Sequence, residues 1–136
     1  MRSIALDTNA YAAFKRGDEN IMTVLQHAPS IIVCITVLGE LLGGFAAGKR
    51  ESINRSELSQ FINSPRVKVV PGTGATADLY ALVYAALRRK GQPVPTNDLW
   101  IAASSLEHGA ALLTFDAHFK NIHGLRVGTR LDDFIP

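Results

Sequence analysis

Short apolar runs alternate along the chain with longer stretches in which apolar residues recur at helical spacing. The run at 31–35 (IIVCI) is apolar throughout, which is typical of a strand buried on both faces, as in a parallel sheet. Shorter runs predict further strands. We expect five strands in all, at residues 4–6, 31–35, 67–70, 111–115 and 125–127.

The stretches between these runs predict helices. The clearest covers about residues 75–90, where apolar side chains fall at i, i+3, i+4, i+7 and i+8 from Leu79 and Gly91 provides a stop. Other helices are expected at 9–16, from an Asp18 cap to about Pro29, from Thr36 or Val37 to Gly48, at 56–62, and from a Thr96 or Asn97 cap to Gly109. This alternation predicts one α/β domain over residues 1–136, a three-layer α/β/α sandwich with a mostly parallel sheet of about five strands.

Four acidic residues lie close to the ends of apolar runs. Asp7 follows the first run and Asp116 follows the run at 111–115. Glu40 lies inside an otherwise apolar helical segment, and Asp98 lies in the first turn of its helix. Because ligands of parallel sheets bind at the carboxyl ends of the strands, we expect these four side chains to meet there.

Clustered carboxylates raise one another's pKa and oppose folding unless a cation or a proton neutralises them. Oxygen ligands without an accompanying His or Cys cluster favour Mg²⁺ or Mn²⁺ over Zn²⁺ or copper. The pattern therefore predicts a divalent cation site with chemistry at phosphate. Taken singly, Asp7 and Asp98 could instead be helix caps, whereas Glu40 requires a partner because an unpaired carboxylate among apolar residues is costly.

The histidines and the cysteine add little to this picture. The four histidines show no H-x-x-x-H spacing, and only His118, two residues beyond Asp116, could reach the site. The lone Cys34 lies within an apolar run, which favours a buried thiol over a nucleophile. No apolar run approaches the roughly 18 residues that cross a bilayer, so we expect a cytoplasmic protein.

The net charge of +2 conceals an uneven distribution. Residues 49–90 hold eight basic side chains against three acidic ones, whereas the remainder of the chain carries a net charge of −3. This basic flank suits a polyanion, although solvated helix faces are the alternative. Its members are Lys49, Arg50, Arg55, Arg66, Lys68, Arg88, Arg89 and Lys90.

Four segments together carry a resemblance to a known family. They are LDTN at 6–9, VLGELLGGFAAG at 37–48, GQPVPTNDLWIAASSLEHG at 91–109 and LLTFDAHF at 112–119. In order and spacing the chain resembles the PIN-domain family, and specifically the VapC or FitB-like ribonuclease toxins of type II toxin–antitoxin modules. The match covers nearly the whole chain but is only a general pattern in residues 49–75.

The resemblance implies a metal-dependent endoribonuclease with Asp7, Glu40, Asp98 and Asp116 as its catalytic and metal-binding quartet. It also implies supporting roles for Thr8, Asn9 and Thr114, and Mg²⁺ or Mn²⁺ as cofactor. An RNA substrate, a small antitoxin and a homodimer or larger complex would be its partners. Lys49, Arg50, Arg88, Arg89 and Lys90 are the candidate RNA-binding residues.

Apolar side chains for such protein contacts could come from Phe14, Leu42, Phe45 and a Tyr80/Tyr84 stripe, each of which could equally lie in the core.

Three other functions compete with this interpretation. A nuclease of the same fold could act on DNA, or in RNA processing without a toxin role. A phosphoacceptor receiver domain also has a Mg²⁺-binding acidic pocket, but Asp7 lacks the adjacent acid that a receiver needs. A nucleotide-binding module is suggested by PGTGAT at 71–76, but neither P-loop nor G-x-G-x-x-G spacing is present. A turn before the long helix explains these glycines better.

Overall fold

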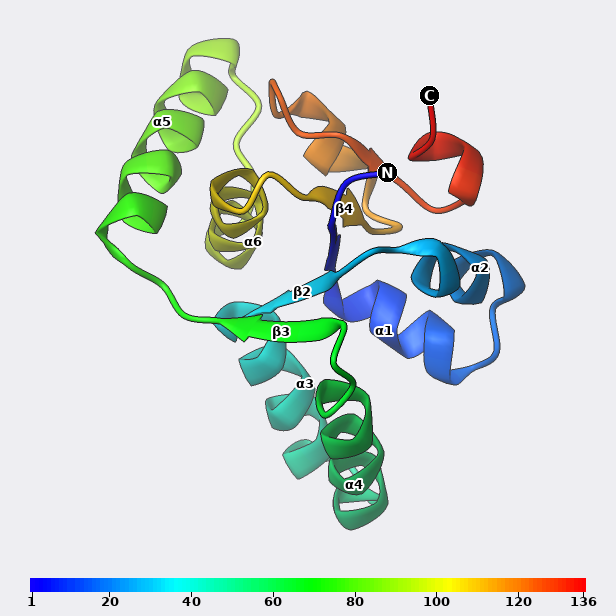
Figure 1. Ribbon diagram of the computed structural model, residues 1–136. Coiled ribbons are helices and arrows are strands. Elements are labelled where there is room, and N and C mark those ends of the chain that lie inside the picture. The colour runs from blue at the N-terminus through cyan, green and yellow to red at the C-terminus, as the bar shows by residue number, and fades with distance from the viewer.

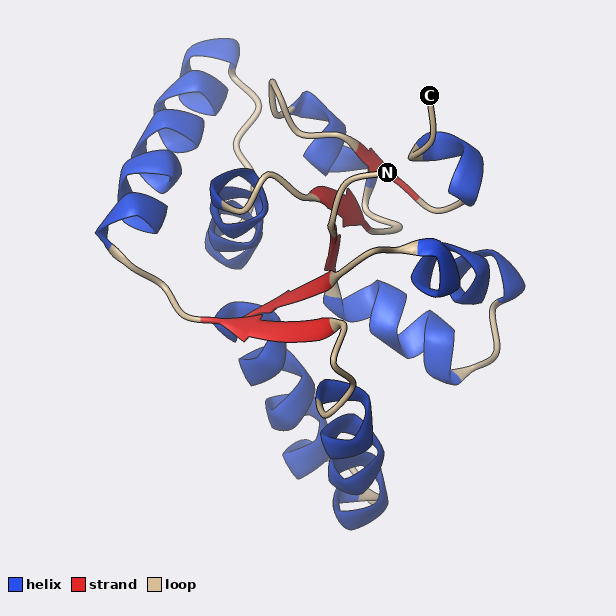
Figure 2. Cartoon of the chain, viewed as in Figure 1, coloured by secondary structure: helices blue, strands red, loops and turns tan.

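The computed structural model describes residues 1–136 as a parallel five-stranded sheet with helices on both faces (Figures 1 and 2). The strands are β1 (Ile4–Leu6), β2 (Ile31–Cys34), β3 (Val67–Val70), β4 (Ala111–Leu113) and β5 (Val127–Gly128). The helices are α1 (Thr8–Lys15), α2 (Glu19–His27), α3 (Ile35–Ala47), α4 (Glu51–Ile62), α5 (Gly74–Lys90) and α6 (Thr96–Glu107), with 3₁₀ helices η1 (Ala117–Asn121) and η2 (Leu131–Asp133). The predicted α/β sandwich is confirmed.

The strand order is β3-β2-β1-β4-β5, and every neighbouring pair is parallel. The chain leaves β1 towards β2 on one side and leaves β4 towards β5 on the other. The carboxyl ends of β1 and β4 therefore form a topological switch point, where α/β sheets open a crevice for ligands. A receiver domain has a different strand order, 2-1-3-4-5, so the structure contradicts that alternative.

Burial follows the apolar runs closely. Every residue of β1, β2 and β4 is buried, as expected for central strands of a parallel sheet. Only the two ends of the edge strand β3 are buried, and Lys68 lies exposed between them. Phe14, Leu42 and Phe45 are partly buried and pack against the core, so their main contacts within the chain are structural.

The helices form two groups around the sheet. Figure 1 shows α5 and α6 on one side, with α1 to α4 on the other, and the α3–α4 pair projecting away from the strands. The long helix α5 packs mainly along α6, where the Tyr80 ring lies 4.2 Å from the Trp100 ring between centroids. Tyr84 stacks on Tyr80 and remains 43% exposed. None of the helices combines the length and apolar character needed to cross a membrane.

Several predicted boundaries were wrong by a few residues. Strand β2 ends at Cys34 because Ile35 already begins α3, with its side chain exposed. Strand β4 ends at Leu113 because the Thr114 hydroxyl turns to Asp7. Strand β5 covers Val127–Gly128 rather than 125–127.

Two predicted helix starts were also wrong. Helix α4 begins at Glu51, five residues before the predicted start, because residues 51–55 hold only one apolar side chain, Ile53, and helical spacing cannot be recognised there. Helix α6 begins at Thr96 with Pro95 as its N-cap, and the Pro95 carbonyl accepts the first helical bond from the amide of Leu99. Neither Thr96 nor Asn97 is therefore the cap, which leaves the Asn97 side chain available for another contact.

Gly128 in β5 is required by close packing at the edge of the sheet. A Cβ atom there would overlap the Asp133 side chain, whose Oδ2 accepts bonds from the amides of Thr129 and Arg130. Gly128→Ala is therefore expected to lower the free energy of unfolding by about 1–3 kcal/mol, the usual cost of overpacking. Urea denaturation would measure this, with Gly74→Ala as control because a Cβ at Gly74 meets no atom within 4 Å.

Candidate metal centre

Asp7 is the buried member of the predicted quartet, only 5% exposed at the carboxyl end of β1. Its Oδ1 accepts a bond from the amide of Thr8 (2.8 Å), and its Oδ2 accepts one from Thr114 Oγ1 (2.6 Å). Burial raises the pKa of Asp7, and the charges of Asp98 and Glu40 raise it further, while the two hydrogen bonds oppose the shift. Asp7 is thus both the N-cap of α1 and a carboxylate that is costly to ionise.

The tightest group of potential metal ligands consists of Asp98, Asp116 and His118. One potential ligand atom from each lies within 4.8 Å of the others. The imidazole of His118 lies between the two carboxylates, with Nε2 2.5 Å from Asp98 Oδ2 and Nδ1 2.8 Å from Asp116 Oδ1. Both ring nitrogens of His118 therefore face a carboxylate oxygen, and the ring joins Asp98 to Asp116.

Glu40 finds the partners that its apolar surroundings require. Its Oε1 accepts a bond from Thr8 Oγ1 (2.6 Å), and its Oε2 accepts one from Asn97 Nδ2 (3.2 Å). Each donor is the chain neighbour of another acid, because Thr8 follows Asp7 and Asn97 precedes Asp98. Glu40 is thereby tied to both the β1 side and the α6 side of the crevice.

Thr114 connects Asp7 with Asp116. Besides donating to Asp7, its Oγ1 accepts a bond from the amide of Asp116 (3.0 Å). The structure therefore brings all four predicted acids into one hydrogen-bonded neighbourhood, although Asp7 and Glu40 lie outside the tightest group. Asn9 is exposed, and its Oδ1 accepts a bond from the amide of Phe115 (3.2 Å), which ties α1 to the end of β4.

The donor set fits a divalent cation. Carboxylate oxygens from four elements converge on one crevice, and the buried Asp7 has no basic side chain bonded to it. Such a group is stabilised by a hard cation. A His ligand is compatible with Mn²⁺ as well as with softer metals. Asp98, Asp116 and Asp7 would hold the ion, with Glu40 and His118 beside them.

The observed roles of two residues of this site, His118 and Asn97, were not predicted from the sequence. His118 was recognised only as able to reach the site, and the signal was its position two residues after Asp116. Asn97 was interpreted as a helix cap, and nothing in the sequence distinguishes a capping Asn from one that bonds Glu40. Cys34 is buried as predicted, and burial raises the pKa of its thiol, which favours the inert form.

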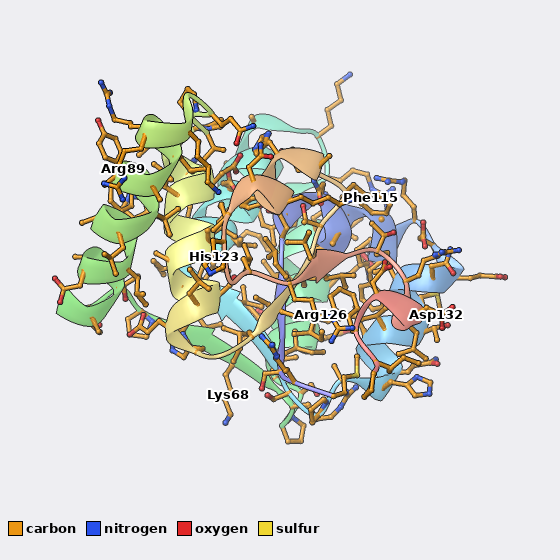
Figure 3. All side chains as sticks on the ribbon, turned by 90° about the horizontal axis from the view of Figure 1, so that it is seen from above. Lys68, Arg89, Phe115, His123, Arg126 and Asp132 are labelled. Atoms are coloured by element: carbon orange, nitrogen blue, oxygen red, sulfur yellow. The ribbon has the colours of Figure 1, made fainter.

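The basic candidates fall into two separate places. Arg88, Arg89 and Lys90 lie in the last turn of α5, and Lys90 Nζ donates to the carbonyl of Asn121 in η1, three residues after His118 (3.2 Å). Figure 3 shows Arg89 and Phe115, the neighbour of Asp116, in the same half of the molecule, with Lys68 at the opposite edge. Lys49 and Arg50 lie at the far tip of the α3–α4 pair.

Arg66 is a structural residue rather than a free cation. Its guanidinium donates to the carbonyls of Leu25 (2.8 Å) and Ala28 (2.6 Å), at the end of α2. This contact holds the start of β3 against the end of α2, so Arg66 is not available for a ligand in this arrangement. The basic flank of the sequence is therefore not one surface.

Replacing Thr114 tests whether its hydroxyl supports the site. Thr114→Val keeps the shape of the side chain but leaves Asp7 Oδ2 and the Asp116 amide without this partner. We expect the free energy of unfolding to fall by about 1–3 kcal/mol, the cost of an unsatisfied buried polar group. Urea denaturation would measure it, and Thr114→Ser, which retains the hydroxyl, should lose less; equal losses in the two variants would contradict this role.

The chain was compared with known proteins. Residues 4–125 match the PIN domain family. Ribonuclease VapC4 of Mycobacterium tuberculosis is 35% identical over 98 residues, which cover 71% of this chain and 75% of that protein. Ribonuclease VapC2 of Rickettsia felis is 30% identical over 125 residues, 88% of this chain and 92% of that protein.

Among solved structures, VapBC2 from Rickettsia felis bound to a DNA fragment from its promoter contains a similar chain. The TM-score is 0.82 with 26% sequence identity, and the alignment covers 92% of this chain and 96% of that one. The match therefore extends over sequence, sheet topology and nearly the full length of the domain. The chain belongs to the PIN-domain family, among relatives named as VapC ribonucleases.

Proposed function

We propose that this protein is a divalent-metal-dependent endoribonuclease and the toxin of a toxin–antitoxin module. The observation that carries the proposal is the group of carboxylates at the β1/β4 switch point, held in place by Thr8, Thr114 and Asn97. The relatives named as ribonucleases cover most of the chain, and they favour RNA over the DNA alternative.

Mg²⁺ or Mn²⁺ is the proposed cofactor, held by Asp7, Asp98 and Asp116 with Glu40 beside them. Such an ion, when bound, activates water and stabilises charge on the departing oxygen. Without it, a cluster of carboxylates repels the phosphates of RNA.

The remaining residues of the site position these carboxylates. Both oxygens of Asp7 and both oxygens of Glu40 accept a hydrogen bond, so neither side chain can rotate without losing a bond. Preorganised ligands of this kind reduce the reorganisation that a reaction would otherwise require. No protein nucleophile is needed, which agrees with the inert environment of Cys34.

The last turn of α5 is the proposed contact for the RNA backbone nearest the site. Lys90 is joined to η1, the helix that carries His118, which places the last turn of α5 next to that segment. Lys49 and Arg50, at the tip of the α3–α4 pair, would reach only a more distant part of an RNA. Binding through these groups should weaken as salt increases.

An antitoxin protein is the proposed regulatory partner, as an inhibitor that covers the carboxylates. A solved structure similar to this chain is that of VapBC2 from Rickettsia felis bound to a DNA fragment from its promoter, which supports a partner of this kind. We also propose a homodimer, or a larger complex with antitoxin, acting on RNA in the cytoplasm. The exposed Leu82 and Tyr84 on α5 are available for such contacts.

Incubation of the purified, antitoxin-free chain with total cellular RNA tests the proposal. Discrete products should appear with Mg²⁺ or Mn²⁺ and disappear with EDTA, and mapping of their ends would identify the target. Parallel incubation with single- and double-stranded DNA separates the two nucleic acids. Cleavage of DNA alone would show that the substrate is DNA rather than RNA. Cleavage that persists in EDTA would contradict the metal site.

A further inference from the structure

A second feature of the crevice is a pocket of about 250 Å³ beside the carboxylates. It lies between the first turn of α3, the loop that follows β3, and the middle of α6. Thr36, Gly72, Thr76, Trp100 and Ser104 are among the residues that line it. None of the acids of the metal centre lines it, so it is a separate compartment.

Two helices, α3 and α6, contribute residues both to the pocket and to the metal centre. On α6, Asn97, Trp100 and Ser104 follow one another at i, i+3 and i+7 and so lie on one face. On α3, Thr36 and Glu40 are one turn apart. Since Asn97 bonds Glu40, the pocket begins about one helical turn, roughly 5 Å, from that bond.

Ser104 points to a ligand. It is only 5% exposed, and its hydroxyl has no hydrogen-bond partner within the chain. The neighbouring Ser105 hydroxyl bonds the carbonyl of Ile101, and the Thr76 hydroxyl bonds Glu107. The Tyr11 hydroxyl also lacks a partner, but Tyr11 does not line this pocket, whereas Ser104 does. Buried hydroxyls in native proteins are normally bonded, to protein, water or ligand. A polar edge inside the pocket would supply the missing partner.

The lining of the pocket selects the chemical class of its occupant. No charged side chain lines it, so a phosphate or a carboxylate finds no counter-charge there. Apolar side chains, one indole ring and free hydroxyls instead suit a flat, neutral ring with hydrogen-bonding groups at its edge. The Trp100 ring is held by Tyr80, which makes it a fixed surface for stacking.

We propose that this pocket is a subsite for a nucleobase of the RNA, one next to the phosphate at the metal centre. The base stacks on Trp100 and forms a hydrogen bond with Ser104 Oγ, as unpaired bases do on aromatic side chains in other RNA-binding proteins. The assignment rests on the proposed ribonuclease function, and it explains how a centre that recognises only phosphate could prefer particular positions in an RNA.

Trp100 is the only tryptophan in the chain, so its fluorescence reports directly on the pocket. The purified chain, kept in EDTA to prevent cleavage, is titrated with RNA hexamers of each base and with an abasic hexamer of equal charge. We expect the base-containing hexamers to quench the fluorescence in a saturable manner, and the abasic hexamer to leave it unchanged.

Two substitutions locate the effect. Gly72→Leu should abolish the quenching, because a Cβ at Gly72 meets no atom within 4 Å and a longer side chain would occupy the pocket. Gly74→Leu is the matched control, since Gly74 has the same free space but does not line the pocket. Ser104→Ala should weaken hexamer binding by about fivefold, the usual value of one hydrogen bond.

The outcomes separate this subsite from the proposed function, because cleavage is measured in its own assay. Equal quenching by the abasic hexamer, or quenching that survives Gly72→Leu, would overturn the subsite even if the chain cleaves RNA. A fluorescence change that depends on protein concentration alone would assign the pocket to a second copy of the chain and also overturn it. Base-dependent quenching without cleavage would support the nucleobase subsite and contradict the proposed nuclease activity.

Discussion

Asp98→Asn is expected to lower the rate of RNA cleavage by at least about a hundredfold. Asp98 belongs to the group whose ligand atoms lie within 4.8 Å of one another, and the substitution removes a negative charge while preserving the size of the side chain. Loss of a partner behind a metal ligand already costs about 10- to 100-fold, so loss of a ligand itself should cost more. Single-turnover cleavage of an end-labelled RNA measures the change.

Asp78→Asn provides the matched control, because Asp78 is an exposed acid on α5 away from the crevice. It should cleave at the rate of the unaltered chain. Circular dichroism and the thermal midpoint would show that both variants are folded. If Asp98→Asn retained more than about a tenth of the activity, Asp98 would not be a metal ligand, and the assignment of the site would have to change.

Addition of Mg²⁺ or Mn²⁺ should raise the thermal midpoint of the unaltered chain. A ligand at 100 times its dissociation constant stabilises the folded state by about 2.7 kcal/mol, which corresponds to roughly 8 °C for a domain of this size. Asp7→Asn should lose most of this response. Differential scanning fluorimetry across a series of cation concentrations measures the shift in the thermal midpoint. If neither cation changed the midpoint of the unaltered chain, the proposed metal centre would be contradicted.

Without added cation, Asp7→Asn should itself be more stable than the unaltered chain at neutral pH. Burial raises the pKa of Asp7 in the folded state above its ordinary value of 3.8, so the folded state binds the proton more tightly. Stability is therefore lost as pH rises from about 3.8 through the raised pKa. The advantage of the variant should be larger at pH 7 than at pH 4, and denaturation at the two values tests this sign.

The architecture was predictable because burial and periodicity agree. The continuous apolar run at 31–35 became a wholly buried strand over Ile31–Cys34. The long helix predicted near 75–90 was found at Gly74–Lys90, with Gly91 in the left-handed conformation at its end. Boundaries failed where tertiary contacts decide them. Glu51 begins a helix in mostly polar sequence. The end of β4 is set by a bond between Thr114 and Asp7, 107 positions away.

The candidate site was predictable in its acids but not in its connections. Asp7 and Asp116 follow strands that the sequence identified, so their meeting required only parallel topology. The bonds of Glu40 to Thr8 and Asn97 depend on how α3 and α6 pack together, which periodicity cannot specify. For the same reason the pocket near Ser104 could not be predicted from the sequence, since its walls come from three segments between residues 34 and 104.

The placement of β4 between β1 and β5 also bears on how the protein is made. Chains grow from the amino terminus, so β1 is made before the other strands of the sheet. More than 100 residues separate β1 from Thr114, which bonds Asp7, and from Asp116 and His118. A nascent chain that has not yet extended past Leu113 carries Asp7 and Glu40 but cannot complete the centre. The proposed ribonuclease activity therefore requires residues 114–118 to have been translated and folded against β1.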